Sequence, residues 1–195
     1  MSAIIEYILA VFIGGAIMLI LIRAGEQTNE SALIANNDQN AQSLIVSTAD
    51  VIEYDMANIG SGVASGTAAV IAADSARFVF LTDLNDDGGV PDTITYFTND
   101  SSSVTVTANI HDRHLFRKTN LSSTEKIGLV TRFILRYATR SGEVLSTPVI
   151  STRLIEIYTI EFSMEMQSGS GVSRHVTNNQ AWYSSAFWQR TYALN

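Results

Sequence analysis

The stretch that decides the fold is Tyr7-Ile-Leu-Ala-Val-Phe-Ile-Gly-Gly-Ala-Ile-Met-Leu-Ile-Leu-Ile22, in which no side chain carries a charge. One carboxylate, Glu6, comes directly before it, and Arg23 ends it. A helix rises about 1.5 Å per residue, so residues 3–22 would extend over about 30 Å, the thickness of a bilayer's hydrocarbon core. We therefore expect a membrane-spanning helix in this part of the chain.

Glu6 is the unusual residue of this segment. A carboxylate at the membrane end of such a helix costs roughly a few kcal/mol unless it finds a partner, so a functional role is favoured over a side chain that only reaches the lipid headgroups. A secretory signal peptide would need a basic start, which is absent, and Arg23-Ala-Gly25 is a poor cleavage site. A buried core helix would rarely be so uniformly apolar, and a plain membrane anchor leaves Glu6 unexplained.

Helical character continues after the apolar segment, because residues 25–59 contain no proline. Apolar residues recur three or four positions apart, as on one face of a helix, at Leu33, Ala41, Leu44, Ile45, Ala49, Ile52, Met56 and Ile59. Gly60-Ser-Gly62 predicts the end, so one helix of about 85 Å is expected to reach Ile59. Gly14 and Gly15 are its weak point, where a kink or close helix packing is expected.

The pattern changes after residue 60 to the alternation that is typical of strands. We expect strands at 77–82, 93–98, 104–107, 115–118, 129–137, 155–164 and 181–194, with a flexible tip at 168–171. A long helix followed by strands predicts the α+β class, with one antiparallel sheet packed on the amphipathic half of the helix. The chain then divides into an apolar helix (1–24), its amphipathic continuation (25–60) and a β-rich globular head (61–195).

The composition of the chain argues against several classes of function. The chain has 195 residues, a net charge of −7 and no cysteine. The acidic balance, without a run of basic residues, argues against nucleic acid as a partner. The absence of cysteine excludes disulfides, thiolate metal sites and cysteine nucleophiles. The sequence also carries no nucleophile elbow, phosphate loop or paired-carboxylate motif, so we do not expect an enzyme.

An acidic loop between the first two expected strands resembles the opening of a calcium loop. Its candidate ligands are Asp83, Asn85, Asp87 and Asp92. The twelfth position of the motif is Ile94 instead of a bidentate glutamate, a role that Asp86 or Asp92 would have to take. The alternative is an acidic hairpin turn that is rich in turn-forming residues.

Two further clusters favour ordinary structural roles. His111-Asp-Arg-His114 offers two imidazoles, but zinc needs further ligands, so a solvated loop is favoured. Four aromatic residues near the end of the chain suggest core packing and subunit contact more than a ligand platform. They are Trp182, Tyr183, Phe187 and Trp188.

The order of these features is similar to that of type IV pilins and type II secretion pseudopilins. Ile52-Glu-Tyr-Asp-Met-Ala-Asn-Ile-Gly60 resembles the helix ending of the larger minor pilins and J-type pseudopilins. Segments 80–88 and 92–96 resemble the first β-hairpin of these proteins. Segments 133–137, 154–157 and 184–195 resemble their later strands. The resemblance therefore covers most of the chain.

This resemblance implies that Glu6 pairs with the free N-terminal amine of a neighbouring subunit and sets the axial register of a filament. The family usually has this glutamate at the fifth position of the mature chain, which Glu6 becomes if Met1 is absent. With Arg23 alone, the positive-inside rule places the head in the cytoplasm; a leader removed before assembly would carry the competing charges. Many pilins have a proline in the helix near its membrane exit; here Gly14-Gly15 would serve instead.

The resemblance implies a structural subunit of an extracellular, type IV pilus-like filament, held in the inner membrane before assembly and polymerised through its apolar helix. Its partners would be further copies and the assembly machinery, with no required cofactor and roles in cell adhesion or protein secretion. Two alternatives stay open. One is a minor pilin or pseudopilin that primes or caps a pilus or secretion pseudopilus; the other is a membrane-anchored, calcium-dependent binding domain.

Overall fold

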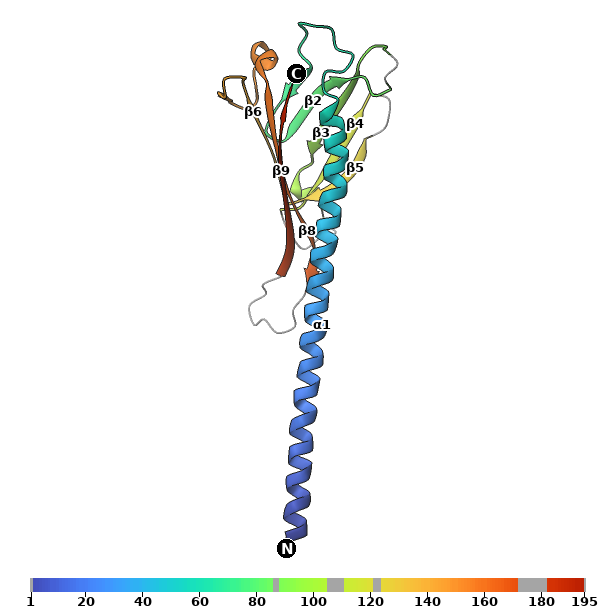
Figure 1. The fold of residues 1–195 in the computed structure, drawn as a ribbon, viewed down its shortest axis with the longest axis vertical. Coiled ribbons are helices and arrows are strands. Elements are labelled where there is room, and N and C mark those ends of the chain that lie inside the picture. Colours follow the sequence, from blue (N-terminus) through green and yellow to red (C-terminus); the bar gives the residue numbers. More distant parts are fainter. Residues whose placement is uncertain (1, 86–87, 105–110, 121–123, 172–181, 195) are drawn as a thin grey trace.

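The computed structural model describes the chain apart from residues 1, 86–87, 105–110, 121–123, 172–181 and 195. A single long helix, α1 (Ser2–Ala57), carries a β-rich head beside its C-terminal half, and its N-terminal half extends well beyond that head (Figure 1). This arrangement confirms the expected α+β layout of a long N-terminal helix followed by antiparallel strands.

The helix is continuous over 56 residues. Gly14 and Gly15 lie within it without a break, and the helix ends two residues before the predicted Ile59. Gly60 follows in the left-handed region, with φ of +83°, a conformation that glycine adopts without steric cost. The hydroxyl of Thr82 donates a hydrogen bond to the carbonyl of Asn58 (2.7 Å) just after the helix end, so the head fixes where α1 stops.

The strands form two antiparallel sheets instead of the single sheet that the sequence predicts. The five-stranded sheet has the order β1-β2-β3-β4-β5, and the four-stranded sheet has the order β7-β6-β8-β9. The strands of the first are β1 (Val70–Ala73), β2 (Arg77–Thr82), β3 (Asp92–Thr98), β4 (Arg113–Thr119) and β5 (Glu125–Val130). Those of the second are β6 (Arg132–Ala138), β7 (Val144–Leu145), β8 (Thr159–Gly171) and β9 (Trp182–Ala193).

The predicted single strand at 129–137 is wrong because the chain changes sheets within it. Val130 and Phe133 are both buried although they lie three residues apart, so the inward-facing phase shifts between them. At this point the N–H of Thr131 donates to the carbonyl of Glu165 in β8 (2.9 Å). A run that looks uniform in sequence is therefore the corner between two sheets.

Other boundaries also differ from the prediction. The segment 168–171, expected as a flexible tip, belongs to β8, and the start of 155–164 lies in the short 3₁₀ helix η2 (Ser151–Glu156). The short strands β1 and β7 were not predicted, and a 3₁₀ turn, η1 (Ser101–Ser103), follows β3. The strand expected at 104–107 lies outside the described residues apart from Val104.

The core lies between the second half of α1 and the two sheets. The helix residues that it buries share one face and are Ala41, Ile45, Ala49, Ile52 and Met56. They meet strand side chains such as Phe80, Ile94 and Phe162, which are fully buried. Leu33 and Leu44, which were expected on this face, are exposed. Leu33 lies before the part of α1 that the head covers, and Leu44 lies beside the buried stripe of Ala41 and Ile45.

Candidate functional site

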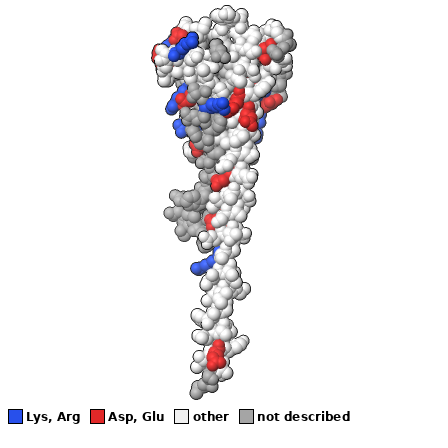
Figure 2. All heavy atoms as spheres, in the orientation of Figure 1, with Lys and Arg blue, Asp and Glu red and all other residues white. Residues whose placement is uncertain are grey.

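The first candidate surface is the half of α1 that lies outside the head. Every large apolar side chain from Ile4 to Ile22 is exposed, and α1 is the helix, among the described residues, that is long and apolar enough to cross a membrane. We call this part of α1, which lies outside the head, the rod. Figure 2 shows that charged side chains are sparser on the rod than on the head. A soluble monomer rarely exposes so large an apolar surface, so this half of the helix is a candidate surface for contact with a membrane or with another apolar helix.

The assembly residues singled out in the sequence all lie on this half. Glu6 is exposed near the N-terminal end, on the first turns of the rod. Gly14 and Gly15 have no atom within 4 Å of where a Cβ would stand, so the backbone there is open to close approach by another helix. The structure therefore places all three candidate residues on the exposed half of α1, and their role in assembly stays a prediction.

A buried polar cluster joins α1 to the five-stranded sheet. Asp55, in the last turn of α1, accepts two hydrogen bonds from Arg117 of β4 (2.6 and 3.0 Å) and one from the hydroxyl of Tyr96 of β3 (2.5 Å). The hydrogen bond to Asp55 raises the pKa of Arg117, and burial together with the nearby Asp55 carboxylate raises the pKa of the Tyr96 phenol. The cluster is a clamp that fixes the end of α1 against the head.

The acidic loop is held by its own carboxylates. Asp83 accepts a hydrogen bond from the N–H of Gly88 (3.0 Å), and buried Asp92 accepts one from the N–H of Leu84 (3.2 Å). Asn85 is exposed, and Asp87 lies outside the described residues. No group of three or more candidate metal ligands occurs within the described part of the chain. These contacts are those of a structured turn, and calcium binding stays a prediction.

The two histidines of the third cluster do not converge. His111 lies in an exposed turn, whereas His114 lies in β4 with its ring edge-on to Phe116 (centroids 6.0 Å apart). Burial, and after it the charge of Lys126, lowers the pKa of His114, which favours the neutral form of its imidazole. Within the described residues, the buried Nδ1 of His114 has no hydrogen-bond partner.

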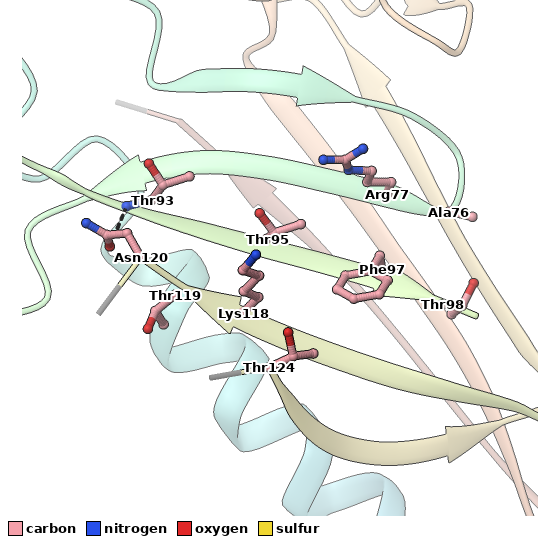
Figure 3. A pocket seen from close by; sticks show the side chains of 10 residues that line it. All are labelled: Ala76, Arg77, Thr93, Thr95, Phe97, Thr98, Lys118, Thr119, Asn120 and Thr124. Carbon is pink, nitrogen blue, oxygen red and sulfur yellow. Dashed lines mark hydrogen bonds between the residues drawn. The ribbon is translucent and has the colours of Figure 1, made fainter. Parts of the chain in front are cut away.

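Sequence reasoning missed a groove on the five-stranded sheet. It has a volume of about 800 Å³ and lies across β2, β3 and β4, on the face turned away from α1 (Figure 3). Most of the residues that line it are of polar type, with two cations and one aromatic ring among them: Ala76, Arg77, Thr93, Thr95, Phe97, Thr98, Lys118, Thr119, Asn120 and Thr124. The alternation of the strands produces it, because Ile94 and Tyr96 point to the core while Thr95 and Phe97 point outward.

No protein family, curated protein or solved structure matches this chain. The class is therefore defined by the architecture alone. It is an α+β protein with a long N-terminal helix that is apolar enough to span a membrane and antiparallel sheets packed on the other half of that helix.

Proposed function

We propose that this protein is the structural subunit of an extracellular, type IV pilus-like filament. In this proposal the subunit polymerises through the exposed half of α1. The observation that carries the proposal is that the head covers α1 only from about Ala41 onward, which leaves the apolar side chains from Ile4 to Ile22 without a protein partner. Before assembly the bilayer would cover this surface, and in the filament the helices of neighbouring copies would replace the lipid.

The shape of the subunit supports a helical polymer. The exposed rod continues without a break into the half of α1 that packs on the head. The Asp55 clamp ties the C-terminal end of that helix to the sheet. A subunit with different surfaces at its two ends would contact its neighbours through unlike surfaces, and such contacts generate a helical filament when the rotation between copies does not close into a ring.

Glu6 has a specific place in this proposal. In the apolar centre of a bundle of rods, its carboxylate would need a cation or a donor. The N-terminal amine of a neighbouring copy is the partner that the resemblance implies. The pair would fix the axial register between copies, while the apolar contacts around Gly14 and Gly15 would supply the packing.

The test is to image the surface of cells that express the full chain and to identify this chain along the filaments with a specific antibody. Labelling along the whole length supports the structural subunit. Labelling restricted to filament ends would assign the chain to the minor, priming or capping role. Cells with the chain in the membrane and no filament would refute the proposal and leave the anchored binding domain.

A further inference from the structure

The groove on the outer face of the five-stranded sheet has a chemistry that the filament role does not use. It lies on the face opposite to the one that α1 covers, because Tyr96 reaches Asp55 of the helix and its neighbours Thr95 and Phe97 point the other way. Among the side chains drawn in Figure 3, those that share this outer face come from the adjacent strands β2, β3 and β4 and are Arg77, Thr93, Thr95, Phe97 and Lys118.

The strand register places these side chains in cross-strand rows. Arg77 of β2 lies opposite Phe97 of β3, and Phe97 lies opposite Phe116 of β4. In the next row Thr95 lies opposite Lys118. Side chains directly opposite each other in antiparallel strands are close neighbours, so the two cations flank a hydroxyl and an aromatic ring.

The charge of the groove contrasts with that of the whole protein. The chain has a net charge of −7, yet none of the described residues that line the groove is an aspartate or glutamate. Arg77 and Lys118 are exposed and form no ion pair with a carboxylate within the described part of the chain. A groove in an acidic protein whose two cations pair with no carboxylate among the described residues is complementary to an anionic ligand.

The other side chains that line the groove indicate which chemical groups the ligand has besides its negative charge. Threonine hydroxyls both donate and accept hydrogen bonds, and two of them, at Thr93 and Thr95 of β3, line the groove. Asn120 accepts a hydrogen bond from the N–H of Thr93 (3.1 Å) through its Oδ1, which leaves its amide group to donate. Phe97 is half-buried and stacks on Phe116 (centroids 5.2 Å apart), so a firmly held ring borders the groove.

We propose that this groove binds a carboxylated carbohydrate, with Arg77 and Lys118 pairing with its carboxylates and the threonine hydroxyls bonding to its ring hydroxyls. The apolar face of a sugar would pack against the ring of Phe97. The inference goes beyond the proposed filament function and does not rest on it, since a lone anchored subunit would carry the same groove.

Three competing ligands fit less well. Many phosphate sites add backbone N–H groups at helix N-termini or in turns to their side-chain cations. The N–H groups beneath this groove form the hydrogen bonds between strands or, at Thr93, bond to the Asn120 side chain. A single-stranded nucleic acid needs several stacking rings along a basic track, and Phe97 is the aromatic residue in the lining. A peptide strand adds to the edge of a sheet, and this groove lies on a face.

The experiment measures binding to the full-length chain in non-ionic detergent. The probe is an oligogalacturonate, and the matched control ligand is the same oligomer with its carboxylates methyl-esterified. The ester keeps the shape and the ring hydroxyls and removes the charge, so we expect it to bind at least about tenfold more weakly, which corresponds to about 1.4 kcal/mol. Raising the salt concentration should weaken the binding of the oligogalacturonate, because added salt screens partly exposed charge pairs.

Variants locate the binding to the groove. Arg77→Gln and Lys118→Gln should each lower the affinity for oligogalacturonate about tenfold. Arg132→Gln, which removes the same charge from an exposed position on β6 of the other sheet, should leave the affinity unchanged. All three positions are exposed, so the variants should fold like the parent chain, which a melting curve checks.

Several results would overturn the inference. They are no binding of oligogalacturonate, equal binding of the esterified oligomer, and an equal loss of affinity in Arg132→Gln and Lys118→Gln. Tighter binding of single-stranded DNA than of oligogalacturonate would also overturn it and would assign the groove to nucleic acid instead.

Discussion

Arg117 of β4 holds Asp55 of α1 through two hydrogen bonds, from Nε to Oδ2 (2.6 Å) and from Nη2 to Oδ1 (3.0 Å). The Asp55 side chain is 1% exposed and that of Arg117 is 16% exposed. Such a paired arrangement has directional strength that a single contact lacks. Asp55 lies at the C-terminal end of α1, and Arg117 lies on an inner strand of the five-stranded sheet. This pair therefore fixes the position of the helix end against the head.

Breaking this pair should be costly. Asp55→Ala leaves the Arg117 guanidinium and the Tyr96 hydroxyl without their acceptor, so we expect a loss of about 3–5 kcal/mol in the free energy of unfolding. Glu53→Ala is the matched control, because Glu53 pairs with Arg190 at 2.6 Å while both side chains are substantially exposed (32% and 56%). Its loss should stay within about 1 kcal/mol. Denaturant unfolding of both variants in detergent measures the difference, and equal losses would show that Asp55 is no clamp.

Removing the Glu6 carboxylate should impair assembly more than expression. Glu6→Ala takes a charge out of the apolar segment, so membrane insertion should persist, while the partner amine in the filament would be left buried and unpaired. The loss of one partner from a buried pair costs about 3–5 kcal/mol, and it recurs with each added subunit. We expect short or absent filaments by electron microscopy, with normal amounts of chain in the membrane.

Two variants isolate this effect. Glu30→Ala removes the same charge from an exposed position on α1 beyond the apolar segment and should leave filament length unchanged. Glu6→Gln keeps an acceptor but loses the ion pair, so its filaments should be intermediate. Filaments of normal length from Glu6→Ala cells would contradict the register role and leave apolar packing alone to hold the rods.

If the loop between β2 and β3 binds calcium, calcium should raise the free energy of unfolding of the protein. Addition of calcium to about ten times Kd would add about 1.4 kcal/mol by mass action, and the affinity of weak extracellular sites is in the range of about 0.1–1 mM. Chelation should therefore lower the melting temperature and calcium should restore it. Identical melting curves in chelator and in calcium would leave only a hairpin turn.

Two variants of the loop distinguish the loss of a calcium ligand from the loss of a hydrogen bond that stabilises the turn. Asn85→Ala removes an exposed candidate ligand, so it should abolish the response to calcium without changing stability in chelator. Asp83→Ala also removes the acceptor for the N–H of Gly88 and should lower stability in chelator as well. A calcium response that persists in Asn85→Ala would exclude this residue from the site.

Alkaline pH should destabilise the head through its buried tyrosines. Burial, and after it the Glu53 charge, raises the pKa of Tyr192 to about 12, and burial raises the pKa of Tyr96 and Tyr137 as well. A folded-state pKa above the ordinary value favours the protonated phenol in the folded protein. For Tyr192 this contribution is complete below about pH 10 and is lost as the pH rises to about 12. Unfolding measured from pH 8 upward, together with tyrosinate absorbance, follows the loss.

Two phenylalanine substitutions test this assignment. The hydroxyl of Tyr192 is buried without a hydrogen-bond partner in the described part of the chain, so Tyr192→Phe should cost little at neutral pH and should reduce the alkaline loss. Tyr137 donates to the carbonyl of Asp74 (2.9 Å), so Tyr137→Phe should cost about 1 kcal/mol at neutral pH. An alkaline profile that is unchanged in Tyr192→Phe would place the titrating group elsewhere.

The rod and the strand faces were predictable because both depend on local periodicity. The uncharged segment before Arg23 and the recurrence of Ala41 and Ile45 follow from helical spacing. The alternation of Ile94 and Tyr96 with outward-facing threonines follows from strand spacing. Glu6 was recognisable as exceptional for the same reason, since a single carboxylate interrupts an apolar pattern.

The tertiary structure decided what depends on residues that are distant in the chain. Asp55 and Arg117 are separated by 62 positions, and the groove joins side chains from β2, β3 and β4, so no local pattern brings them together. The shift of phase between Val130 and Phe133 divides one apparent strand between two sheets, which the packing of β6 on β8 determines. The sequence by itself determined which surfaces must avoid water, because hydrophobic periodicity is local; the structure alone decided which polar groups meet, because strand pairing sets those distances.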